Sequence, residues 1–248
     1  MIRSILLALD TTDASALTQH LAIRICQEIS SRSGECARPV HLTGVAVVDR
    51  PTIKRPVSAP IGGGAYKADR DEAMLADAHE KLTEILDQFE ADCRESDIPC
   101  STVRAEGLPY EQIQQSARSH DLIMIGKDTN FHFETSTETG DTVRQLLKAS
   151  PRPVVVVPEA VEKGTNVVIA YDGSLQASHA LHLWTLLDLK AHDSVIHVVS
   201  ISTKLDEAEG HCREAATLLG YHDIEVRTHA IESDAGLAKV LDEHAAQW

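Results

Sequence analysis

Five short runs with strand character alternate with amphipathic segments along the first 160 residues of the chain. They occupy residues 4–10, 40–49, 101–107, 121–126 and 152–158. Runs such as SILLALD and DLIMIG are almost wholly apolar, which is typical of parallel strands that are buried on both faces. This alternation predicts an α/β fold with a doubly wound, parallel, five-stranded sheet.

The segments between these runs have the apolar spacing of helices. Helices are predicted at residues 11–30, 71–96, 109–120 and 141–150. Residues 50–67 contain proline and glycine throughout, so they are predicted to form a loop.

The opening pattern returns after residue 165. Residues 166–187 lie over residues 4–25 at an offset of 162, which pairs Asp10 with Asp172 and His20 with His182. Later in the chain, residues 226–230 match residues 103–107, and His244 matches His120. Such a repeat predicts two related domains, at 1–160 and 165–248. The segment after His244 is short, so the second copy is expected to lack its fourth strand, the following loop, the last helix and the fifth strand.

Composition narrows the function classes. The formal net charge of −15 disfavours a broad nucleic-acid surface, because phosphate binding needs clustered lysine and arginine. The five cysteines form no CxxC pair and are odd in number, which indicates reduced thiols in a cytoplasmic protein. Neither a signal peptide nor a membrane span is predicted.

The motifs resemble those of the universal stress protein family. The first copy has ILLALD at its start, Gly107 after the third strand, DLIMIG at the fourth and GDTVRQLLKASPRPVVVVP at its end, and the second copy opens with VVIAYDGSLQAS. The resemblance covers essentially the whole chain. It implies strand order 3-2-1-4-5, a stress-response role, and a nucleotide site between strands 1 and 4, where open α/β sheets hold ligands.

ATP-binding members of that family carry a glycine-rich loop, and residues 126–142 follow its pattern only in part. Gly126 matches the first glycine, Thr129 replaces the second, and Gly140 matches the third with one extra residue between. Asp141 stands at the Ser/Thr position, with Thr142 beside it. A β-branched threonine hinders close backbone approach to a phosphate, and a carboxylate repels the anion. Asp141 is instead a good N-cap for the helix that follows.

Two hypotheses follow for this loop. The first is a capped, solvated loop that binds ATP weakly or not at all. The protein then acts by associating with partners and is not an enzyme. The alternative is an ATP-binding protein, with slow hydrolysis, in which the resemblance implies Asp10 and Val47 for ribose and adenine. Gly126, Gly140 and Thr142 then contact the phosphates, with Mg²⁺ offsetting the acids. Asp172 and Val198 hold the corresponding places in the second copy, where no ATP is expected.

Other candidate chemistry is weaker. Residues 61–66 (IGGGAY) lie in mid-loop and are predicted to be a flexible linker instead of a phosphate cradle. His179 and His182, or His132 with Glu134 and Asp128, could bind a metal, but the sequence places no further ligand and surface histidines are the simpler interpretation. Asp10 and Asp172 could be catalytic acids or could hold the turns that follow them. No catalytic residue is therefore assigned.

Assembly is predicted from the edge strand at 152–158. An exposed apolar edge tends to find a partner, so this strand is expected to pair across a homodimer axis. The second copy is expected to leave the edge of its first strand unpaired.

Overall fold

The computed structural model describes residues 2–32, 38–55, 64–129, 131, 141–160, 166–188, 194–235 and 237–244. The chain divides into two compact units, which are described separately below. The first unit spans Ile2–Val161 and the second covers Glu162–Trp248.

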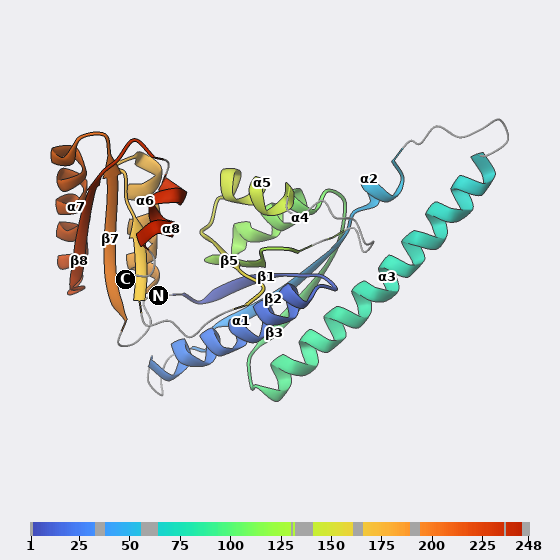
Figure 1. The fold of residues 1–248 in the computed structure, drawn as a ribbon. Coiled ribbons are helices and arrows are strands. Elements are labelled where there is room, and N and C mark those ends of the chain that lie inside the picture. Colours follow the sequence, from blue (N-terminus) through green and yellow to red (C-terminus); the bar gives the residue numbers. More distant parts are fainter. Residues whose placement is uncertain are drawn as a thin grey trace. The chain divides into compact units, whose positions relative to one another are not determined.

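The first unit is built on a parallel sheet of five strands (Figure 1). The strands are β1 (Ser4–Leu9), β2 (His41–Val48), β3 (Cys100–Glu106), β4 (Leu122–Gly126) and β5 (Val154–Val157). Their order is β3-β2-β1-β4-β5, which confirms the predicted fold class and strand order. Strand β1 is central because its almost wholly apolar sequence is suited to burial on both faces.

Helices cover both faces of this sheet. Helices α1 (Asp13–Arg32) and α3 (Gly64–Glu95) pack on one face, and α4 (Pro109–Ser116) and α5 (Asp141–Ala149) pack on the other (Figure 1). A short 3-10 turn, Ala117–Ser119, extends α4.

The region predicted as a loop at 50–67 is partly helical, so that prediction was wrong. Helix α2 (Arg50–Ile53) follows β2 directly, and the side chain of Asp49 caps it by accepting a hydrogen bond from the backbone N–H of Thr52. Helix α3 already begins at Gly64, so Gly64–Tyr66 form its first turn instead of a linker, while residues 61–63 lie outside the described residues. Alanine and charged residues after Gly64 are good helix formers, and they extend the helix through a segment that glycine alone would not favour.

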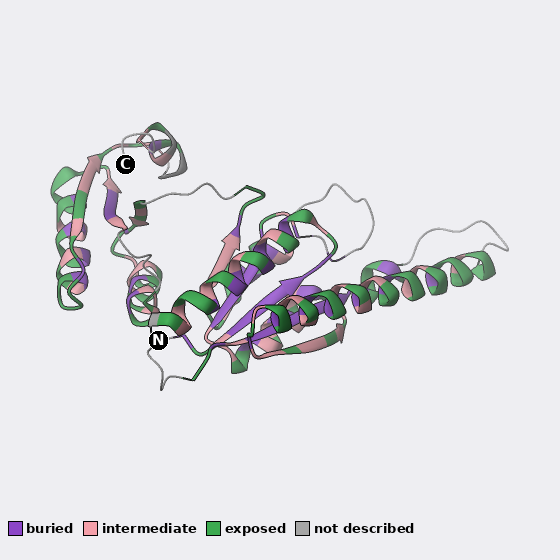
Figure 2. Cartoon of the chain, turned by 90° about the horizontal axis from the view of Figure 1, so that it is seen from below, coloured by how far each residue is buried: buried purple, intermediate pink, exposed green. Residues whose placement is uncertain are grey.

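Close packing of α3 on β2 depends on a glycine. A Cβ atom on Gly44 would lie 2.8 Å from Cδ1 of Leu9 and 2.9 Å from the ring of Phe89. Phe89 is fully buried, and the buried stripe of α3 runs from Ala78 to Cys93. The N-terminal half of α3 is mostly exposed (Figure 2).

The amino ends of β1 and β4 are joined by one carboxylate. Asp121 accepts hydrogen bonds from the backbone N–H groups of Arg3 (2.8 Å) and Ser4 (3.0 Å), and from the Ser4 hydroxyl (3.2 Å). Burial alone would raise the pKa of Asp121, but these hydrogen bonds and the charge of Arg152 lower it below its ordinary value. The ionised carboxylate therefore fixes the alignment of the two strands that flank the candidate site.

The second unit has a smaller parallel sheet. Its strands are β6 (Asn166–Ala170), β7 (Val195–Ser202) and β8 (Val226–Glu232), in the order β6-β7-β8. Helices α6 (Leu175–Leu187) and α7 (Leu205–Gly220) share an apolar cluster with the sheet, and α8 (Leu237–His244) follows β8. Within the described part of this unit β6 pairs with β7 alone.

The helices were compared with the length and hydropathy of membrane-spanning helices. Across the described ranges, no helix combines the length and the apolar character that a bilayer crossing requires.

Candidate functional site

The candidate site lies where β1 and β4 end side by side. These strands are neighbours in the sheet, and the chain leaves them toward opposite faces, which makes this the topological switch point of the fold. Asp10 directly follows β1, and Gly126 is the last residue of β4. The structure therefore places two of the predicted site residues at the edge where open α/β sheets hold ligands.

The bonds of Asp10 stabilise the turn into α1. The side chain is 4% exposed, and its Oδ1 accepts hydrogen bonds from the backbone N–H (2.9 Å) and the hydroxyl (2.6 Å) of Thr12. The backbone N–H of Asp10 also donates to the hydroxyl of Ser15 at 3.0 Å. The sequence allowed two roles for Asp10, a catalytic acid or a residue that holds the following turn. This geometry supports the second role.

Thr129 closes a tight turn after β4. It is 3% exposed, its hydroxyl donates to the Gly126 carbonyl at 2.7 Å, and its backbone N–H points to the same oxygen at 3.3 Å. A Cβ atom on Gly126 would lie 2.8 Å from the Thr129 hydroxyl and 3.1 Å from the backbone of Ala14. The end of β4 thus packs tightly against the start of α1, and the Thr129 hydroxyl is directed into the protein.

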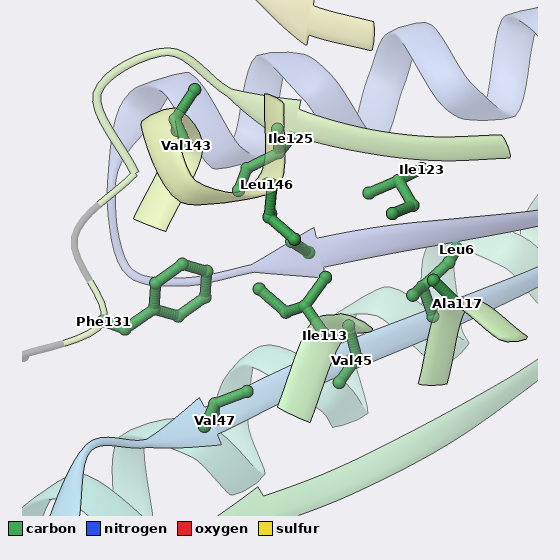
Figure 3. Close-up of a cluster of buried hydrophobic side chains, with 11 residues drawn as sticks. Leu6, Val45, Val47, Ile113, Ala117, Ile123, Ile125, Phe131, Val143 and Leu146 are labelled. Atoms are coloured by element: carbon green, nitrogen blue, oxygen red, sulfur yellow. The ribbon is translucent and has the colours of Figure 1, made fainter. Parts of the chain in front are cut away.

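Phe131 belongs to the same buried apolar cluster as Val47. It is 2% exposed and belongs to one buried cluster with Val47, Ile113, Val143 and Leu146 (Figure 3). The cluster lies between the sheet and the helices α4 and α5. The loop itself therefore places an aromatic ring next to the strand that the resemblance assigns to adenine.

Sequence reasoning missed Phe131. A signal was available, because aromatic residues are only 4% of the chain and two of them, Phe131 and Phe133, interrupt a polar loop. A large apolar residue in such a place is buried more often than exposed.

The remaining loop residues are only partly described. Gly140 lies outside the described residues, as do His132 and Glu134. Asp141 begins α5, but the structure does not describe its side chain, so its predicted capping role stays a prediction. Thr142 is half-buried in the first turn of α5.

The second unit has a cavity at the corresponding end of its sheet. The cavity has a volume of about 680 Å³, and Asp172, Ser174, Ile201 and Ser233 are among the residues that line it. Hydrogen bonds from Ser174 hold the pKa of Asp172 below its ordinary value, against a smaller opposing effect of burial. The cavity lining combines carboxylates and hydroxyls with apolar side chains.

Val198 does not correspond to Val47, so this assignment was wrong. Ala8 pairs with Val45, and its counterpart Ala170 pairs with Val199. Two residues further along β7, Ile201 therefore takes the register position of Val47. Val198 instead faces α7, in the buried cluster that contains Cys212. The offset of 162 does not extend to β7, because α6 has 13 residues whereas α1 has 20.

His179 and His182 do not belong to a metal-binding group in the described part of the chain, and His132 lies outside it. His179 and His182 are both exposed on α6, and Asp128 is half-buried next to the turn after β4. No group of three or more histidine, cysteine, aspartate or glutamate side chains in the described residues is arranged to hold a metal ion.

Comparison with solved structures identifies the fold. The crystal structure of a universal stress protein from Archaeoglobus fulgidus aligns with 100% of this chain and 84% of that one, at a TM-score of 0.61 and 18% identity. The chain has the universal stress protein fold. UspA from Lactobacillus plantarum covers 63% of this chain (97% of its own, 23% identity, TM-score 0.43). A member of the family from Burkholderia pseudomallei covers 63% (96% of its own, 18% identity, TM-score 0.42). No family model and no curated protein matches the sequence.

Proposed function

We propose that this chain is a cytoplasmic stress-response protein of the universal stress type, which acts by binding and association and not by catalytic turnover. The first unit is a complete copy of the fold, and the second unit is a partial copy of it. The support is the fold of the first unit, together with the repeated strand–turn–helix in which Asp10 and Asp172 begin the turns.

The first unit binds ATP weakly or not at all. The observation that carries this proposal is the burial of Phe131 in the apolar cluster that contains Val47, the residue that the resemblance assigns to the ribose and adenine. The Thr129 hydroxyl is also engaged by the Gly126 carbonyl, which leaves it poorly placed to donate to a phosphate. The described residues therefore fit ATP with Mg²⁺ poorly.

Calorimetric titration with Mg-ATP tests this proposal. We expect no saturable heat, which corresponds to a dissociation constant weaker than about 1 mM. Mg-ADP and Mg-AMP serve as parallel titrants, because a site that accepts only the adenosine part would bind all three alike. Micromolar affinity for Mg-ATP, or nucleotide released when the purified protein is denatured, would contradict the proposal.

The alternative is an ATP-binding protein with slow hydrolysis. It is favoured by the position of Asp10 and Gly126 at the ends of adjacent central strands, where the fold holds ligands. It requires Phe131 to leave its cluster when nucleotide enters. Micromolar binding in the same titration, together with phosphate release above a no-protein control, would establish this alternative.

We also propose a homodimer that forms through β5. This strand is the last in its sheet and consists of four valines, so its outer edge presents backbone N–H and C=O groups between apolar side chains. The N–H groups of Ile123 and Lys127 donate to the carbonyls of Pro153 (3.0 Å) and Val157 (2.7 Å). Since backbone groups alternate in direction along a strand, those of Val154 and Val156 point away from β4.

A proline at position 156 is expected to convert the dimer into a monomer. Val156→Pro removes one outward N–H without touching the hydrogen bonds to β4, and proline is tolerated in edge strands at such positions. The matched control, Val155→Ala, trims a side chain and keeps every outward N–H. Light scattering should give a dimer mass for the parent and the control, and a monomer mass for Val156→Pro. A monomeric parent protein would contradict the dimer.

A further inference from the structure

Three cysteines form a cluster near the amino ends of the strands in the first sheet, whereas the candidate site lies at the carboxyl ends. Cys26 comes from α1, Cys93 from the last turns of α3, and Cys100 is the first residue of β3. Cys26 and Cys93 are 1% and 0% exposed, whereas Cys100 is half-buried. All three are free thiols.

The chain reverses between Cys93 and Cys100. The N–H of Ile98 donates to the Cys93 carbonyl at 2.9 Å, the N–H of Asp97 donates to the Arg94 carbonyl at 3.2 Å, and Asp97 adopts a φ of 55°. These two hydrogen bonds around a left-handed residue form a Schellman motif, which ends α3 and turns the chain back on it. As a result Cys93 and Cys100 lie near each other, and the Cys100 side chain contributes to the raised pKa of Cys93.

Access to the two thiols is unequal. Cys100 lines a cavity of about 830 Å³ together with Glu90, Arg94 and Pro99. Cys93 has no exposed surface, so a small solute reaches Cys100 first. Burial raises the pKa of Cys26 to about 12, and burial together with the neighbouring Cys100 thiol raises the pKa of Cys93. The two buried thiols are therefore protonated at neutral pH and do not react first.

We propose that Cys100 and Cys93 form a redox-active dithiol that small-molecule disulfides oxidise to an intramolecular disulfide. The Cys100 thiolate attacks one sulfur of oxidised glutathione; the bond between its two sulfurs breaks, and one glutathione leaves as a thiolate that takes up a proton. Cys93 then loses its proton and attacks the Cys100 sulfur, which releases the second glutathione. Two protein thiols are oxidised and one small disulfide is reduced to two thiols, so electrons and protons balance.

The second step relies on proximity. The high pKa of Cys93 keeps its thiolate fraction low, but the turn at Asp97 holds Cys93 near the sulfur that it attacks. An intramolecular reaction in this arrangement has a high effective concentration, which offsets the low thiolate fraction. Cys26 is fully covered and is expected to stay reduced.

Mass spectrometry of the folded full chain after incubation with oxidised glutathione tests this proposal. We expect a mass lower by two hydrogens, reversed by dithiothreitol. Trypsin cleaves after Arg94, so the disulfide joins two separate peptides and can be assigned directly. Cys36 lies outside the described residues, and the matched variants Cys36→Ser and Cys212→Ser are expected to give the same Cys93–Cys100 link.

Two further variants separate the steps. Cys93→Ala should trap glutathione on Cys100 as a stable adduct, because the thiol that resolves it is missing. Cys100→Ser should show neither the adduct nor the mass loss. A Cys26–Cys93 link, a lasting adduct on Cys100 in the parent, or unchanged thiols would each overturn the proposal. The peptide map of the parent decides the matter even where a variant folds poorly.

Discussion

Replacing Phe131 with alanine is expected to lower the free energy of unfolding of the first unit by about 3 kcal/mol. The side chain is 2% exposed and shares a buried cluster with Val47, Ile113, Val143 and Leu146. Alanine would lose the transfer free energy of the ring and leave a cavity between the sheet and α5. The expected effect is at the lower end of the range for phenylalanine because a loop can collapse more readily than a helix or a strand.

The positions of the tryptophans allow this loss to be assigned to one unit. Both tryptophans, Trp184 and Trp248, belong to the second unit, so their fluorescence reports on that unit alone. Urea unfolding followed by circular dichroism should show an earlier transition for Phe131→Ala, while the fluorescence transition stays in place. Tyr66→Ala is the matched control, since Tyr66 is 77% exposed and its loss should change stability by less than about 0.5 kcal/mol. An equal effect of the two substitutions would mean that Phe131 is not part of the core.

Phe89→Ala is expected to cost more, about 4 kcal/mol, because the ring is fully buried between α3 and the sheet. Here the surrounding elements are a long helix and two central strands, which relax little around a cavity. The same unfolding experiment measures the loss.

A second substitution reports on the packing itself. Gly44→Ala in the parent should cost about 2 kcal/mol, because its Cβ atom would lie 2.8 to 2.9 Å from Leu9 and Phe89. In the Phe89→Ala background the conflict with the ring disappears, so the additional cost of Gly44→Ala should be clearly smaller. Strictly additive losses would show that α3 does not press on β2 at this residue.

The sequence was most informative where periodicity is strong. The apolar runs at 4–10 and 121–126 predicted β1 and β4 within a residue of their observed bounds, because buried parallel strands have few other possible compositions. The start of α3 at Gly64 was missed, because glycines usually indicate a loop while the helix here is extended by the residues that follow them.

The site was harder to predict because it depends on packing across the chain. Residue spacing identified Gly126 and Thr129 as part of one loop, but the inward hydrogen bond of Thr129 becomes visible only when the turn is formed. Phe131 becomes a site residue only through neighbours from β2, α4 and α5. The sequence likewise suggested Val198 in place of Ile201 as the counterpart of Val47, because strand register depends on pairing, which sequence position does not reveal.

Helix α3 is continuous over 32 residues, but its two halves differ in what covers them. From Ala78 onward one stripe is buried against the sheet, whereas in the half from Gly64 to Asp77 the buried residue is Asp71, which is paired with Lys67 and Arg70 of the same helix. Opening the outer turns therefore exposes little apolar surface, while opening the inner turns requires the core to separate. The helix is thus expected to fray from its N-terminal end by local fluctuations that leave the rest of the first unit folded.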